Sequence, residues 1–140
     1  ILNEIQAIIA QEQLKLLPKM LKRRRYIASV YNNELKNIPN LHCQKIVKDV
    51  NSAYYSYIMK LTKGNLKKFR KTLKEKGIET SPMFTTIYKT KIYQKLSIFS
   101  NNCPISEILD DQTFTIPLHV GITNAETDYV VKTIKKILDL

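Results

Sequence analysis

The residues best suited to metal or nucleophilic chemistry are few and lie at three separate places along this chain. They are His42, Cys43, Cys103 and His119. No pair among them has the short spacing of a zinc site. His42 and Cys43 are neighbours on an expected strand, so their side chains should point to opposite faces. His119 could touch a substrate, although a loop histidine with only local hydrogen bonds is the simpler reading. The sequence therefore predicts no metal site.

Two adjacent carboxylates and a basic cluster are the other candidates. Asp110 and Asp111 could act as a pair, but a polar turn before a strand explains them more simply. Lysine and arginine number 23 against 12 acidic residues, which gives a net charge of +11 and suits an anionic partner. The densest cluster is Lys15, Lys19, Lys22, Arg23, Arg24 and Arg25.

This cluster runs around a helix rather than along one face. The tyrosines at 54, 55 and 57 could stack on bases, but no recognised binding motif accompanies the charge. We therefore expect only weak, salt-sensitive nucleic-acid association without sequence preference. If Tyr55 and Tyr57 lie on one strand they share a face, and core packing then explains at least one of the tyrosines.

Composition limits the function further. The chain has 140 residues, 44% of them apolar, which fits one globular domain. Its three glycines are too far apart for a dinucleotide fingerprint or a P-loop. Two cysteines do not form a disulfide framework, so we expect a reduced, cytoplasmic setting. No apolar run approaches a membrane span, and the N-terminus does not have the pattern of a signal peptide.

A long helix is expected over residues 3–36. Its apolar residues recur every three or four positions, and Arg24 interrupts that stripe. Asn3 is a suitable N-cap, and Pro18 should bend or divide the helix. The N-terminal isoleucines exceed what a small sheet can cover, which predicts self-association.

Three short strands and further helices follow. The strands are expected at 41–48, 53–61 and 113–116. Helices are expected at 65–76, ended by Gly77, and at 124–138, begun by a Thr123–Glu126 capping box. Residues 82–103 could be helical or extended with a break at Asn101–Asn102, and Pro104 should begin a short helix. The predicted fold is α+β: a small antiparallel sheet of about three strands covered by helices and preceded by the long helix.

Three separated strings together resemble one enzyme family. They are AIIAQEQLKLLPKMLKRRRYIASVYNNEL, FRKTLKEKGIET and IPLHVGITNAETDYVVKTIKKIL. Their order and spacing are similar to the C-terminal part of the DegT/StrS family of sugar aminotransferases, which use pyridoxal phosphate (PLP). Residues Ile27–Tyr31 match its I-A-x-x-Y segment, Arg70–Thr80 its R-x-x-L-x-x-x-G-I-x-T element, and Ile116–His119 its L-P-x-H segment.

The resemblance implies a fold-type I small domain over residues 1–140. Residues 1–37 would be the long linking helix and 38–140 an α/β sandwich. Such enzymes transfer an amino group to a nucleotide-linked keto-sugar, in polysaccharide or amino-sugar biosynthesis. Their PLP lysine lies upstream of the matching segment, on a large domain that would be the missing partner, and they work as dimers. We therefore expect the chain alone to bind no PLP and to be inactive, and we nominate no catalytic or cofactor-binding residue.

One departure concerns the expected substrate contacts. Where the family usually has a His-Tyr pair near the sugar, this chain has Met83 and Phe84. Either the substrate differs, or the chain is degenerate, or the alignment slips by a few residues. Met83, Phe84 and His119 are thus the expected substrate-binding residues. The alternative function is a non-catalytic basic interaction domain that binds nucleic acid or another anionic partner.

Overall fold

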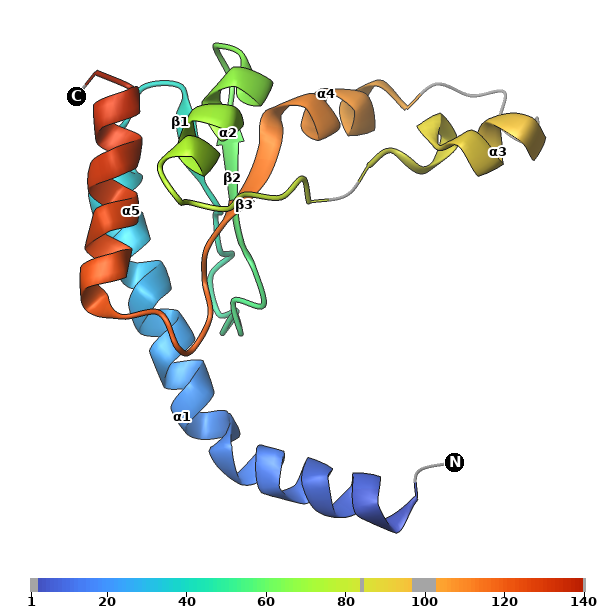
Figure 1. Cartoon of the computed structure of the whole chain (residues 1–140), viewed down its shortest axis with the longest axis vertical. Coiled ribbons are helices and arrows are strands. Elements are labelled where there is room, and N and C mark those ends of the chain that lie inside the picture. Colours follow the sequence, from blue (N-terminus) through green and yellow to red (C-terminus); the bar gives the residue numbers. More distant parts are fainter. Residues whose placement is uncertain (1–2, 84, 97–102, 140) are drawn as a thin grey trace.

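The computed structural model describes residues 3–83, 85–96 and 103–139. In chain order its elements are α1 (Glu4–Leu35), β1 (Leu41–Cys43), β2 (Tyr57–Leu61), α2 (Leu66–Glu75), the 3₁₀ turn η1 (Ile87–Lys89), α3 (Lys91–Leu96), α4 (Pro104–Gln112), β3 (Thr113–Ile116) and α5 (Asn124–Ile137). This is the predicted α+β architecture, with a long N-terminal helix and a small antiparallel sheet (Figure 1).

The sheet has the order β1-β2-β3, and both pairs of strands are antiparallel. Met59 on the central strand lies opposite Cys43 on one side and Phe114 on the other. Because side chains alternate along a strand, these residues share one face of the sheet. That face is buried except at the half-buried Cys43, whereas Ile58 and Thr113 lie on the opposite, half-exposed face.

Helices from both ends of the chain cover the buried face. The C-terminal half of α1 lies beside α5 (Figure 1), and α2 also packs against α5. Their contributions to the core are Ile27, Ala28, Tyr31, Leu35, Phe69, Leu73, Val130, Val131 and Ile134. The predicted packing of the 65–76 and 124–138 helices on the sheet is confirmed.

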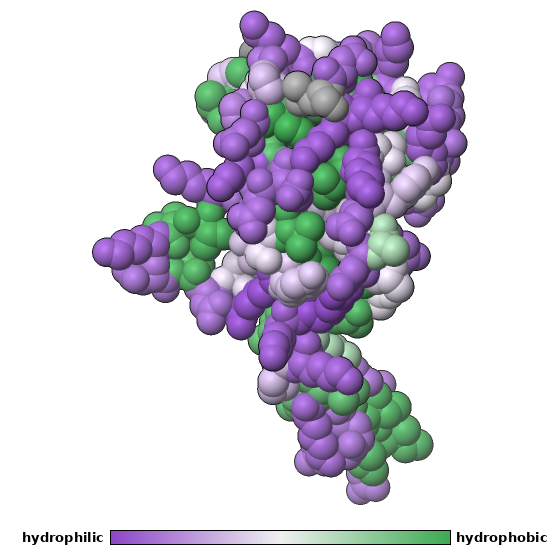
Figure 2. Space-filling model, turned by 90° about the vertical axis from the view of Figure 1, so that its left-hand side faces the viewer, coloured by the Kyte–Doolittle hydropathy of each residue, from purple (hydrophilic) through white to green (hydrophobic). Residues whose placement is uncertain are grey.

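The two halves of α1 have different surroundings. All four buried residues of this helix, Ile27, Ala28, Tyr31 and Leu35, lie in its C-terminal half. The N-terminal half projects away from the sheet (Figure 1) and exposes apolar side chains (Figure 2). Asn3 caps the helix as predicted, through a capping box with Gln6. Pro18 lies inside the continuous helix, which bends between its two halves, because a proline cannot donate to the helix ladder.

Two predicted strands are shorter than expected. The strand expected over 41–48 ends at Cys43, and the one expected over 53–61 begins only at Tyr57. Tyr54 adopts a positive φ of 45°, which breaks the extended backbone. Tyr55 is consequently outside the strand and 87% exposed, so it shares no face with the fully buried Tyr57. The loop between β1 and β2 bonds to α1 instead of to a partner strand.

The described residues 85–96 are largely helical. η1 and α3 resolve the open choice between helix and strand in favour of helix, while the expected break at Asn101–Asn102 lies outside the described residues. The prediction of a turn at Asp110–Asp111 is wrong, because α4 continues through both residues and leads directly into β3. Within the described ranges, no helix combines the length and apolar character needed to cross a membrane.

Candidate functional site

The expected substrate-binding residues do not line one common cavity. Met83 lines a cavity of about 560 Å³, which we call the Met83 cavity. His119 lines a different cavity of about 460 Å³, which we call the His119 cavity. Phe84 lies outside the described residues. The structure thus separates two residues that the sequence analysis had grouped together.

The Met83 cavity lies against the half-exposed face of the sheet. Ile58 of β2 and Leu109 of α4 contribute apolar walls, and Ser106 and Asp110 contribute polar groups from α4. The hydroxyl of Ser56 donates to the Met83 sulfur at 3.8 Å. A mostly apolar hollow with a few polar groups is the usual form of a small-molecule site. Sequence analysis missed the contribution of α4, because periodicity does not show which loop a helix will pack against.

Helix α4 holds the segment that forms the mouth of this cavity. The Asp110 carboxylate accepts from the backbone N–H of Thr86 at 3.0 Å, and the Tyr88 hydroxyl donates to Glu107. Lys89 also lies 3.4 Å from the Glu107 carboxylate. The Tyr88 hydrogen bond lowers the pKa of Glu107 and raises the pKa of Tyr88 itself. Two carboxylates on α4 therefore fix the chain that follows Met83.

The His119 cavity lies between α5, the edge of β3 and the residues after α2. Backbone pairing of Ser81 with Thr115 places that segment at the sheet edge, through an N–H···O bond of 2.8 Å. Gly121 lies beside His119, since a Cβ added to the glycine would lie 3.4 Å from Nδ1 of the imidazole, at ordinary contact distance. Glu126 also lines the cavity, and its pKa is lowered mainly by hydrogen bonds from Thr123, with a smaller contribution from His119.

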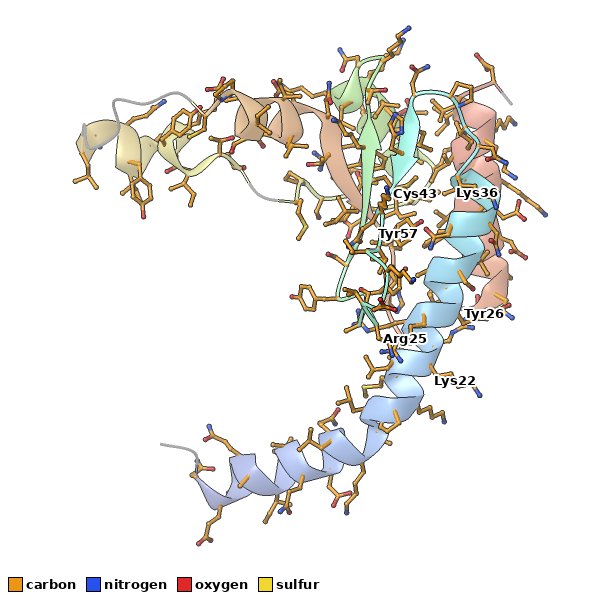
Figure 3. All side chains as sticks on the ribbon, turned by 180° about the vertical axis from the view of Figure 1, so that it is seen from behind. Lys22, Arg25, Tyr26, Lys36, Cys43 and Tyr57 are labelled. Carbon is orange, nitrogen blue, oxygen red and sulfur yellow. The ribbon has the colours of Figure 1, made fainter. Side chains whose placement is uncertain are left out.

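The three consecutive arginines of α1 bind other parts of the same chain. Arg23 donates to the backbone oxygen of Ile122 and to Asn124. Arg24 donates to the backbone oxygens of Tyr54 and Tyr55 at 2.9 and 2.8 Å. Arg25 donates to Ser52 at 3.0 Å, and in Figure 3 it points toward the loop while Lys22 points away from it. These guanidinium groups hold two loops onto α1.

Neither a PLP lysine nor a metal centre is formed by the described residues. A lysine that carries PLP works from a desolvated site, but every lysine here is exposed or half-exposed. In this chain on its own, no described lysine has such a desolvated site. No group of three or more His, Cys, Asp or Glu side chains in the described ranges could hold a metal ion.

Comparison with known proteins identifies the family. A model of the DegT/DnrJ/EryC1/StrS aminotransferase family matches residues 1–135. The chain belongs to this family. It is 31% identical, over 98% of its own length, to MJ1066, an uncharacterised protein of Methanocaldococcus jannaschii. It is 27% identical, again over 98% of its length, to the dTDP-4-dehydro-2,3,6-trideoxy-D-glucose 4-aminotransferase of Saccharopolyspora spinosa.

The fold is that of solved family structures. The aminotransferase TlmJ from Streptoalloteichus hindustanus matches 98% of the chain with a TM-score of 0.89 and 23% identity, and the chain covers 37% of that structure. The PLP form of the sugar aminotransferase Spr1654 from Streptococcus pneumoniae also has a TM-score of 0.89, at 23% identity, with 98% of this chain and 36% of that one covered. The chain spans 37% and 35% of the two curated relatives.

Proposed function

We propose that this chain is the small domain of a PLP-dependent sugar aminotransferase. The observation that carries the proposal is the family match over residues 1–135, combined with a span of only about a third of the relatives' length. A PLP-binding large domain would be its partner, and residues 1–37 would link the two domains. The whole protein would work in the cytoplasm as a homo-oligomer in polysaccharide or amino-sugar biosynthesis.

The proposed reaction transfers an amino group to a nucleotide-linked keto-sugar. PLP on the large domain would supply the electron sink for that chemistry. The residues of this chain would bind and orient the sugar. Met83 would contact it on the half-exposed face of the sheet, and His119 would do so from the loop after β3. Phe84 is included on the family resemblance alone. The apolar wall formed by Ile58 and Leu109 supports a sugar with few hydroxyl groups near Met83.

Cofactor trapping tests whether a lysine of this chain binds PLP, which we assign to the large domain. The purified chain is mixed with PLP, reduced with borohydride and mapped by mass spectrometry, beside a PLP enzyme as positive control. We expect scattered, substoichiometric labelling, because no described lysine is desolvated. A single lysine labelled stoichiometrically, with cofactor release that depends on an amino acid, would contradict the proposal.

Kinetics of a two-domain protein test the substrate role. The chain is joined to a PLP-binding large domain of the family, and the two half-reactions are measured separately. Met83→Ala should raise KM for the keto-sugar while leaving the half-reaction with the amino donor unchanged. Lys132→Ala, an exposed change on α5, is the control. An equal loss in both half-reactions would remove Met83 from the sugar site.

A further inference from the structure

Helix α2 carries a concentrated positive charge. With its C-cap it contains six basic residues, Lys67, Lys68, Arg70, Lys71, Lys74 and Lys76, and one acidic residue, Glu75. The net charge of this segment is 6 − 1 = +5, out of +11 for the whole chain. Nearly half of the excess charge thus lies on one short helix, which the sequence analysis passed over in favour of the cluster on α1.

Most of these cations are free to bind a partner. The arginines of α1 are used inside the molecule, Lys15 pairs with Glu12, and Lys135 pairs with Glu34. On α2, within the part of the chain that the structure describes, the only ion pair is Lys71 with Glu75 at 3.9 Å. Both of those side chains are strongly exposed, so the pair holds Lys71 weakly.

Four of the cations form a stripe. Residues 67, 70, 71 and 74 have the spacing that places side chains on one helical face, and the stripe is roughly 10 Å long at 1.5 Å per residue. They line a groove of about 350 Å³ together with Glu79 and Thr80. Arg70 is fixed there by bonds to the Thr80 hydroxyl at 3.0 Å and to the Thr80 backbone oxygen at 2.9 Å. We call this surface the α2 basic stripe.

The helix itself is firmly placed. Phe69 and Leu73 on its other face are buried in the core, and Asn65 caps its N-terminus. The stripe therefore has a fixed backbone and exposed lysine side chains, which can reach phosphate groups in solvent. It also lies at the opposite end of the molecule from the N-terminal half of α1 (Figure 1).

We propose that the α2 basic stripe binds the phosphate backbone of nucleic acid without sequence preference. One strand of a duplex carries a phosphate about every 3.4 Å, so the stripe spans roughly three phosphates. A line of cations fits such an extended polyanion better than it fits a single phosphate, which needs donors that converge on one point. The stripe offers charge but no side chain set to read base edges, so it positions the partner without reading sequence.

Salt dependence of binding is the first test. Fluorescence anisotropy with two duplexes of unrelated sequence should give equal affinities. Three phosphate contacts predict a slope of about −2.7 for log K against log salt concentration, or roughly 40-fold weaker binding at 200 mM than at 50 mM salt. Absence of binding at 50 mM salt, or a preference for one sequence, would overturn the proposal.

Matched variants place the contact on the molecule. Lys67→Gln with Lys71→Gln should make the slope shallower by about 2. The control is Lys132→Gln with Lys136→Gln, which removes the same charge from two exposed positions four residues apart on α5. Equal effects of both pairs would mean that diffuse charge alone binds, and would overturn the proposal. Glu79→Gln, which removes the carboxylate from the groove, should tighten binding severalfold, and misfolding cannot produce that gain.

Discussion

The hydroxyl of Tyr31 donates a hydrogen bond of 2.7 Å to the backbone oxygen of Pro117. The tyrosine belongs to the segment Ile27–Tyr31 on α1, and the proline belongs to Ile116–His119 after β3. The Tyr31 ring is fully buried and packs on Tyr57, with ring centroids 5.0 Å apart. Burial raises the pKa of Tyr31, so its hydroxyl stays protonated and remains a donor. This hydrogen bond therefore joins two motifs that are distant in the sequence. We call the contact the Tyr31 joint, and it positions the loop that contains His119.

Tyr31→Phe should destabilise the fold while keeping its shape. The variant leaves a partly buried carbonyl oxygen without its donor, which costs about 1–3 kcal/mol in the free energy of unfolding. Urea denaturation followed by circular dichroism measures that change. Tyr26→Phe is the control, because Tyr26 is 47% exposed and its hydroxyl has no hydrogen-bond partner in the described part of the chain. Equal stability of the two variants would contradict the role of the Tyr31 joint.

Arg24→Met should release the loop between β1 and β2. The methionine keeps an apolar stem but loses the guanidinium that holds the backbone oxygens of Tyr54 and Tyr55. We expect a loss of about 1–2 kcal/mol in stability, since hydrogen bonds from a charged donor are the stronger kind and this side chain is only half-buried.

Hydrogen exchange locates the effect of that change. Amides of residues 52–56 should exchange faster in the Arg24 variant, while those of α5 keep their protection. Lys22→Met is the matched control, because Lys22 is exposed and points away from the loop (Figure 3). Faster exchange throughout the molecule would show a general loss of stability instead of a released loop.

The regular parts of this fold could be predicted from local signals. The capping boxes at Asn3 and Thr123, the positive φ of Gly77 and the start of α4 at Pro104 each depend on a few neighbouring residues. The strand ends could not be predicted in this way. The loop before β2 is held by Arg24, which is 30 residues away in the sequence and donates to the Tyr54 oxygen, so local signals do not show it.

The candidate site was predicted only in part. Met83 and His119 each line a cavity, but which residues surround them depends on tertiary packing. The sequence predicted a turn at Asp110, yet this residue lies on α4, and its carboxylate accepts a hydrogen bond from the backbone N–H of Thr86. The sequence analysis interpreted the arginines of α1 as a possible phosphate-binding cluster. Composition shows where charged residues are, but it does not show whether their side chains already bind other parts of the chain. Spacing on α2 contained the signal for the basic stripe, in the i, i+3, i+4, i+7 pattern of its cations.

Acid should loosen the mouth of the Met83 cavity. The pKa of Glu107 lies below its ordinary value of 4.5, chiefly through the Tyr88 hydroxyl and also through Lys89. A lowered folded-state pKa means that the ionised form is the stabilising one. The contribution is therefore fully present above pH 4.5 and is lost as the pH falls through the folded-state pKa.

Carboxyl-carbon NMR titration of Glu107 checks this directly. The midpoint should lie below 4.5 and should move upward toward that value in Tyr88→Phe. Lys89→Met should move it in the same direction, because Lys89 also lowers this pKa through its hydrogen bond and its charge. A midpoint unaffected by Tyr88→Phe would show that the hydroxyl does not hold the carboxylate in solution.

The N-terminal half of α1 should make the isolated chain self-associate. Ile5, Ile8, Ile9 and Leu14 are 71%, 60%, 57% and 64% exposed on a helix that projects from the sheet (Figure 2). Burial of such surface is worth about 25 cal/mol per Å², so pairing of these segments is favourable. A symmetric helix pair is the expected form, since two-fold contacts are the commonest oligomer interface. Sedimentation velocity should show a dimer or a larger species.

Ile9→Asp should shift that equilibrium toward monomer, because a paired helix face would have to bury the new carboxylate. The control is Ile92→Asp on α3, which changes an isoleucine that is 71% exposed and far from α1 in the structure (Figure 1). The control should leave the sedimentation coefficient unchanged. A wild-type chain that stays monomeric at high concentration would mean that the N-terminal half of α1 folds back onto its own sheet in solution. Equal effects of the two aspartates would place the contact elsewhere on the surface.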